Sequence, residues 1–178
     1  MLPSIKPPVP RFNKEALRFV AIDSGASGAI CVWAYDTKEF ALYKLKGTDP
    51  KDLFPVLDQV LGDNRELDCV VIEEPPKFMG PKIPGARIAV LFESFGIMVG
   101  YLMAKNVKVI RITPHKWQKR LNDLVGTRGD MAHGDWKKVL YKYAQSRYGN
   151  ADGLIGQTAD SLLIAEWWLA EGAFDKYD

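Results

Sequence analysis

Two apolar segments that each end on a carboxylate constrain this chain more than any other feature of its sequence. Residues 18–22 read Arg-Phe-Val-Ala-Ile and are followed by Asp23, and residues 69–72 read Cys-Val-Val-Ile and are followed by Glu73 and Glu74. Short apolar runs of this kind predict buried strands. Because an unpaired carboxylate is costly to bury, two such strand ends indicate a divalent cation bound between them.

The order of the predicted elements indicates the fold class. The first three strands are joined by short connections, which makes them antiparallel neighbours. The predicted strands are residues 18–23, 29–35, 39–46, 68–73 and 107–113, and the predicted helices are residues 50–61, 86–105, 114–121, 135–148 and 157–170, with Asp49 and Asp135 as the N-caps of the first and fourth helices. This order predicts an α/β fold in which a mixed five-stranded sheet, three antiparallel strands followed by two parallel ones, has helices on both faces.

Length and composition favour one globular domain. The chain has 178 residues, 47% of them hydrophobic, which is enough for a full core. We expect a domain over residues 17–178 and a flexible, proline-rich arm over residues 1–16, which lacks the apolar segment of a secretory signal. The longest apolar run, residues 94–104, is too short to cross a bilayer, so we expect no membrane association. Cys31 and Cys69 lie in predicted strands and indicate buried thiols in a reducing, intracellular compartment.

Positive charge is concentrated in one segment. Residues 105–148 contain eleven Lys and Arg side chains against three Asp, a net charge of +8, whereas the whole chain carries only +2. Such a segment is typical of a protein that binds a polyanion. A solvated helical face would have the same composition, so the charge alone leaves both interpretations open.

The predicted helix over residues 86–105 is apolar on nearly every side. A helix of this kind must be covered on every side. The sheet covers one side, and either a partner subunit or other parts of a monomer would cover the rest. Gly96 and Gly100 would allow two copies of the helix to approach closely.

A third acidic residue, Asp160, lies in the first turn of the last predicted helix. Carboxylates that converge from several elements are the ligands that Mg²⁺ uses when it acts on phosphate groups. Each residue also has a structural interpretation: Asp160 as a helix N-terminal charge, Asp23 as a turn residue, and Glu73 as a solvent-facing side chain.

Four segments, in this order, resemble one known family. Residues 21–29 (Ala-Ile-Asp-Ser-Gly-Ala-Ser-Gly-Ala), 71–73 (Val-Ile-Glu) and 158–165 (Thr-Ala-Asp-Ser-Leu-Leu-Ile-Ala) are similar to the three motifs of RuvC-type Holliday junction resolvases, which belong to the ribonuclease H-like superfamily. Residues 114–121, which begin Pro-His-Lys-Trp, are similar to a stretch of the chloroplast and phage branch. The resemblance covers residues 18–170.

The resemblance implies a homodimeric endonuclease that cuts four-way DNA junctions by symmetric nicks, with two Mg²⁺ or Mn²⁺ ions in each active site. Asp23, Glu73 and Asp160 would be the metal ligands, and Gln157 occupies the position of a fourth, usually acidic or His, ligand. Lys119 would be a catalytic lysine, and the loop over residues 75–86 would probe the junction. The DNA contacts implied are Lys77, Phe78, Lys82, Lys116, Lys119, Arg120, Lys137 and Lys138.

Other functions remain open at this stage. A nuclease of the same fold could act on RNA–DNA hybrids or flaps, and Gln157 could mark a branched-DNA-binding module that has lost catalysis. The Asp23–Gly28 turn also resembles the phosphate loop of actin-like kinases. Those proteins need two duplicated lobes, and a chain of 178 residues is too short for them.

Overall fold

A mixed five-stranded sheet forms the centre of the molecule, as the computed structural model shows for residues 17–25, 27–62, 66–77, 84–129 and 131–171. The strands are β1 (Arg18–Asp23), β2 (Ala29–Ala34), β3 (Phe40–Lys44), β4 (Leu67–Glu73) and β5 (Val109–Ile112), in the spatial order β3-β2-β1-β4-β5. The first three pair antiparallel, whereas β4 is parallel to β1 and β5 is parallel to β4. The predicted fold class is therefore confirmed.

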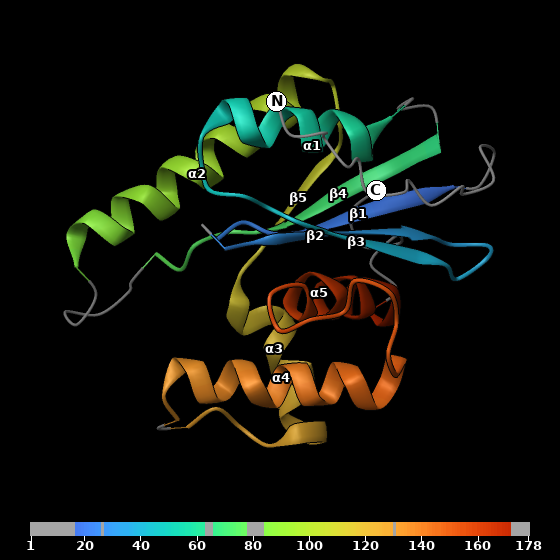
Figure 1. Cartoon of the computed structure of the whole chain (residues 1–178), viewed down its shortest axis with the longest axis vertical. Coiled ribbons are helices and arrows are strands. Elements are labelled where there is room, and N and C mark those ends of the chain that lie inside the picture. Colours follow the sequence, from blue (N-terminus) through green and yellow to red (C-terminus); the bar gives the residue numbers. More distant parts are fainter. Residues whose placement is uncertain (1–16, 26, 63–65, 78–83, 130, 172–178) are drawn as a thin grey trace, which may run out of the picture.

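Helices cover both faces of this sheet (Figure 1). On one face lie α1 (Pro50–Leu61) and α2 (Gly85–Ala104); on the other lies α5 (Ala159–Ala170), with α3 (Pro114–Val125) and α4 (His133–Tyr148) packed beyond it. Successive residues of a strand point to opposite faces, and β1 divides accordingly. Phe19 and Ala21 belong to the hydrophobic cluster with α5, and Val20 and Ile22 belong to the cluster with α1 and α2.

Several predicted boundaries need correction. The N-cap at Asp49 is confirmed, because its carboxylate accepts a hydrogen bond from the backbone N–H of Lys51 at 3.0 Å. The cap predicted at Asp135 is wrong: α4 begins two residues earlier, its N-cap is Ala132, and Asp135 lies in the first turn. Helix α5 begins at Ala159, so Gln157 lies just before the helix and not in it.

Helix α2 is covered on one side only. Ser94, Met98, Val99 and Leu102 are buried, while Val90, Phe92 and Met103 are 41%, 42% and 62% exposed. The N-terminal end of α2 projects beyond the sheet in Figure 1. Helix α2 has 20 residues, and an 18-residue window within it has a mean hydropathy of 1.5, which is long and apolar enough to cross a membrane by length and composition alone. The structure therefore leaves an apolar helix face without a cover among the described residues.

Candidate active site

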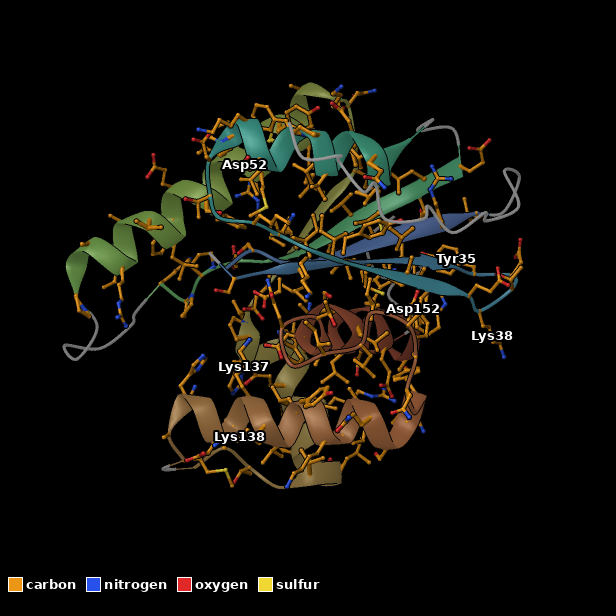
Figure 2. The ribbon with its side chains drawn as sticks, in the orientation of Figure 1. Tyr35, Lys38, Asp52, Lys137, Lys138 and Asp152 are labelled. Carbon is orange, nitrogen blue, oxygen red and sulfur yellow. The ribbon has the colours of Figure 1, made fainter. Side chains whose placement is uncertain are left out.

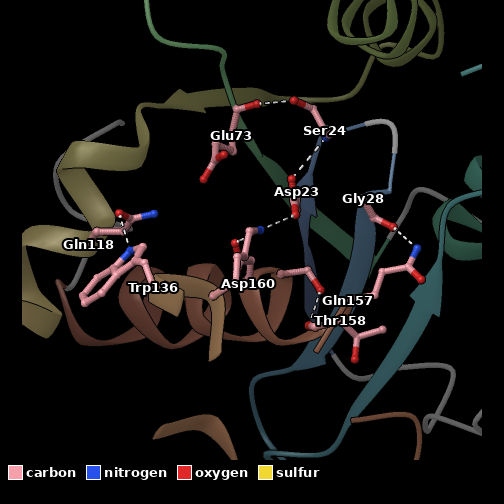
Figure 3. A network of polar contacts seen from close by, with 12 residues as sticks. Asp23, Ser24, Gly28, Glu73, Gln118, Trp136, Gln157, Thr158 and Asp160 are labelled. Carbon is pink, nitrogen blue, oxygen red and sulfur yellow. Dashed lines mark hydrogen bonds and ion pairs between the residues drawn. The ribbon is translucent and has the colours of Figure 1, made fainter. Parts of the chain in front are cut away.

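Three carboxylates meet at one edge of the sheet. Strands β1 and β4 are parallel neighbours, and Ile22 lies opposite Ile72. The next residues, Asp23 and Glu73, therefore lie side by side at the ends of these two strands. Asp160, in the first turn of α5, lies against the same edge. Figure 3 shows the three side chains directed toward a common space. The three carboxylates that the sequence singled out thus lie at the same edge, and Asp23 and Asp160 are only 7% and 3% exposed.

The turn after β1 holds Asp23 in place. Its carboxylate accepts a hydrogen bond from the backbone N–H of Gly25 at 3.1 Å, and the N–H of Gly28 donates to the carbonyl of Gly25 at 2.8 Å. The hydroxyl of Ser24 donates to the backbone carbonyl of Glu73 at 2.7 Å, which links the two strand ends. A Cβ atom at Gly28 would lie 2.1 Å from the backbone oxygen of Asp23, so only glycine fits at this position.

Glu73 is held by a tryptophan. The indole N–H of the fully buried Trp117, on α3, donates to the Glu73 carboxylate. Burial raises the pKa of Glu73 to about 8, and the negative charge of Asp23 adds to the increase, while the Trp117 hydrogen bond opposes it. The charged form of Glu73 is thus destabilised, which a nearby cation would reverse.

A lysine lies between the other two carboxylates. The ammonium group of Lys137, on α4, forms an ion pair with Asp160 Oδ2 and lies 3.5 Å from Asp23 Oδ2. Burial lowers the pKa of Lys137, but Asp23 and Asp160 raise it by more, so its net shift is upward. Burial raises the pKa of Asp160 to about 6 despite the charge of Lys137.

The donor set fits a hard divalent cation. Asp160 Oδ1 is buried and has no hydrogen-bond partner among the described residues, and three clustered carboxylates supply the oxygen ligands that Mg²⁺ and Mn²⁺ prefer. Within the described part of the chain, however, no three acidic, His or Cys side chains already stand close enough together to hold an ion. The ammonium of Lys137 lies at Asp160 Oδ2 instead.

These pKa shifts predict how the stability of the metal-free protein depends on pH. Glu73 binds its proton more tightly in the folded than in the unfolded state, so between about pH 4.5 and 8 folding takes up protons. The free energy of unfolding should therefore fall as pH rises through this window. We expect the Tm in EDTA to fall from pH 5 to pH 8.5 by more in the wild type than in Glu73→Gln. Equal falls in the two proteins would contradict the raised pKa.

Gln157 does not point toward the carboxylates. Its amide nitrogen donates to the backbone carbonyl of Gly28 at 3.2 Å (Figure 3) and to that of Leu45 at 3.3 Å. These bonds link the segment just before α5 to the turn before β2 and to the chain after β3. In this position the side chain cross-links backbone segments. The structure therefore does not bring the expected fourth ligand to the site.

The predicted DNA-contacting residues are only partly placed at the site. Lys119, expected to be catalytic, is exposed on α3, and no described contact joins it to the three carboxylates. Lys116 lies over the Trp167 ring at 5.3 Å, and Arg120 Nη1 is 3.9 Å from a Glu171 oxygen. Lys77 and Lys138 are exposed, Lys138 in an ion pair with Asp135. Phe78 and Lys82 lie outside the described residues.

Two site residues had no clear signal in the sequence. Trp117 is an apolar residue in a helical segment, which indicates a core position; it is fully buried, and its N–H also donates to Glu73. Lys137 reads as a DNA contact like Lys138, yet it lies inside the carboxylate cluster. Both assignments depend on how α3 and α4 pack beside the sheet.

The comparison with known proteins bears on the fold. No protein-family model matches the chain, and no curated protein sequence matches it. Among solved structures, RuvC of T. thermophilus in complex with a Holliday junction substrate is similar, with a TM-score of 0.55 and 14% sequence identity. The similarity covers 87% of this chain and 96% of the RuvC chain. Fowlpox virus resolvase in complex with Holliday junction DNA is similar over 86% of this chain and 97% of its own, at 18% identity and a TM-score of 0.51. The chain thus has the ribonuclease H-like fold of RuvC-type resolvases, while a special likeness to the chloroplast and phage branch stays a prediction.

Proposed function

We propose that this protein is an endonuclease that resolves four-way DNA junctions by metal-dependent hydrolysis of phosphodiester bonds. The observation that carries this proposal is the convergence of Asp23, Glu73 and Asp160 at the β1–β4 edge. It occurs in a fold shared with two structures that hold Holliday junction DNA. Cys31 and Cys69 are buried and not joined in a disulfide, which is in keeping with the reducing, intracellular location that we also propose.

Asp23, Glu73 and Asp160 would hold Mg²⁺ or Mn²⁺, two ions in each site. When bound, such ions activate a water and stabilise the leaving oxygen of a phosphodiester. The protein contributes the orientation of the ligands: the Gly25 N–H holds the Asp23 carboxylate, and the Trp117 indole holds Glu73. Exposed basic side chains of the segment 105–148, among them Lys119 and Lys138, would bind the phosphate backbone of the junction arms.

Removal of the Trp117 indole donor should weaken cleavage without unfolding the protein. In Trp117→Phe the Glu73 carboxylate loses the hydrogen bond from the indole N–H. We expect cleavage at limiting Mg²⁺ to fall roughly 10- to 100-fold, the range found when a partner of a metal ligand is removed. Trp136→Phe is the matched control, because Trp136 is equally buried but donates to Gln118. Equal rates for the two variants would contradict a role for Trp117 in the site.

We propose that two copies associate through the exposed face of α2, since paired nicks in a symmetric junction need two active sites. Val90, Phe92 and Met103 are exposed on this helix, and Ser94 Oγ donates to the carbonyl of Ser24 at 3.4 Å, which links α2 to the active-site turn. Phe92→Asp should convert a dimer into a monomer, because it places a charge in the apolar interface. Sedimentation equilibrium at micromolar concentration tests this, and a wild-type monomer would contradict it.

A panel of DNA substrates tests the proposed activity. The purified protein is incubated with Mg²⁺ and a labelled four-way junction, a Y-shaped flap, an RNA–DNA hybrid or a linear duplex. We expect cleavage of the four-way junction in preference to the other three. Preference for the flap or the hybrid would identify another nuclease of the same fold, and binding without cleavage would identify a non-catalytic DNA-binding module.

A further inference from the structure

Two adjacent lysines of α4 have opposite environments. The side chain of Lys137 is 35% exposed and its ammonium contacts Asp160 and Asp23, whereas the side chain of Lys138 is 75% exposed and pairs with Asp135 at 2.9 Å. Figure 2 shows Lys137 on the side of α4 that faces the rest of the fold. Although both were expected to contact DNA, Lys137 serves the carboxylate cluster.

The ammonium of Lys137 occupies the position in which a bound cation would neutralise the site. It lies on one oxygen of Asp160, while the other oxygen is buried without a partner among the described residues. An ammonium group donates hydrogen bonds and accepts none. A divalent ion bound to the same carboxylate oxygens would be repelled by it at this distance. The Lys137 ammonium and a divalent cation therefore compete for the Asp160 carboxylate.

A pocket beside Lys137 could accept its side chain after displacement by a metal ion. This pocket of about 320 Å³ adjoins the cluster and is lined by Ser27, Lys137, Lys138, Tyr141, Gly156 and Gln157. The hydroxyl oxygens of Ser27 and Tyr141 could accept hydrogen bonds from the ammonium there. The four-carbon stem of lysine is flexible, and Lys137 itself lines this pocket.

We propose that Lys137 is an internal counter-ion of the carboxylate cluster that a divalent cation must displace, and that it thereby sets the metal affinity of the site. Lys137 is in this sense a positioning residue. In the metal-free protein its ammonium holds the Asp23 and Asp160 carboxylates close together, and when a metal binds, the ammonium leaves these carboxylates. The inference rests on the proposed metal-dependent function. It concerns the affinity of that site and not the reaction that follows.

Calorimetric titration with Mn²⁺, without DNA, tests this inference. Lys137→Met keeps a long, unbranched side chain but removes the ammonium group, and we expect it to bind Mn²⁺ at least about tenfold more tightly than the wild type. Its Tm in EDTA should be lower, because the carboxylates lose their counter-ion, and Mn²⁺ should raise it by more. Lys138→Met should match the wild type in both measurements, and Lys137→Arg, which keeps the charge, should bind Mn²⁺ no more tightly than the wild type. If Lys137→Met does not fold, Lys137→Gln takes its place.

The outcomes separate the inference from the proposed function. Equal or weaker Mn²⁺ binding by Lys137→Met, with normal binding and junction cleavage by the wild type, would overturn the inference alone. Failure of both the wild type and Lys137→Met to bind Mn²⁺ would overturn the inference and the proposed metal site together. If Lys138→Met bound Mn²⁺ as tightly as Lys137→Met, the gain would be a general effect of lost surface charge. This result would also overturn the inference.

Discussion

Replacement of Asp23 by Asn, Glu73 by Gln or Asp160 by Asn should each abolish junction cleavage and leave junction binding nearly unchanged. Each change keeps the shape of the side chain and removes one ligand charge. Loss of an outer partner of a metal ligand already costs roughly 10- to 100-fold, so loss of a ligand should cost more than about 100-fold. The affinity for DNA comes mainly from phosphate contacts, which these changes do not touch. Gel assays of cleavage in Mg²⁺ and of binding in EDTA measure the two effects separately.

Asp152→Asn provides the matched control for these variants. Asp152 is an exposed carboxylate in the loop before α5 (Figure 2), eight residues from Asp160. Its replacement should leave both cleavage and binding unchanged. Any of the three site variants that cleaves at the wild-type rate would show that its carboxylate is not a metal ligand.

Replacement of Gly28 by Ala should destabilise the protein severely and inactivate it. The new Cβ atom would lie 2.1 Å from the backbone oxygen of Asp23 and 2.7 Å from that of Gly25, so the turn must open. Overpacking typically costs about 1–3 kcal/mol. We expect the upper end here because the contacts are with backbone atoms, which corresponds to a Tm roughly 6–12 °C lower in a protein of this size. Because the turn also holds the Asp23 carboxylate through Gly25, cleavage should be lost even below the transition.

Gly134→Ala is the control for the Gly28 variant. Gly134 lies in α4, and a Cβ atom there meets nothing within 4 Å. Alanine is the better helix former by about 1 kcal/mol, so the Tm should stay the same or rise slightly. A Gly28→Ala protein as stable as Gly134→Ala would mean that the turn is not as tight as described.

Two of the three carboxylates could be predicted from the sequence because each one ends an apolar strand. Residues 19–22 are all apolar because both faces of β1 are buried, against α5 and against α1 and α2. The change from Ile22 to Asp23 therefore marks the end of a central strand. The same holds for Ile72 and Glu73 on β4, and the parallel pairing of the two strands then brings the carboxylates together.

The rest of the site depends on packing that the sequence leaves open. Trp136, Leu140 and Ala144 form the buried stripe of α4, which places Lys137 at the border of that stripe and Lys138 on the far side. The stripe can be read from the sequence, but its position above Asp160 depends on how α4 lies on α5. Likewise, the sequence does not tell whether the amide of Gln157 faces the carboxylates or the backbone. Because α5 begins only at Ala159, Gln157 lies before the helix, and its amide donates to the carbonyls of Gly28 and Leu45.

Cleavage of a supercoiled plasmid that extrudes a cruciform tests the central claim most directly. Two nicks made in one binding event linearise the plasmid, whereas a single nick relaxes it to an open circle and removes the cruciform. With Mg²⁺ the wild type should yield linear product, and neither EDTA-treated protein nor Asp160→Asn should cut. Open circles as the main product would contradict the paired action of two sites, and linear product from Asp160→Asn at the wild-type rate would contradict the assignment of the carboxylate site.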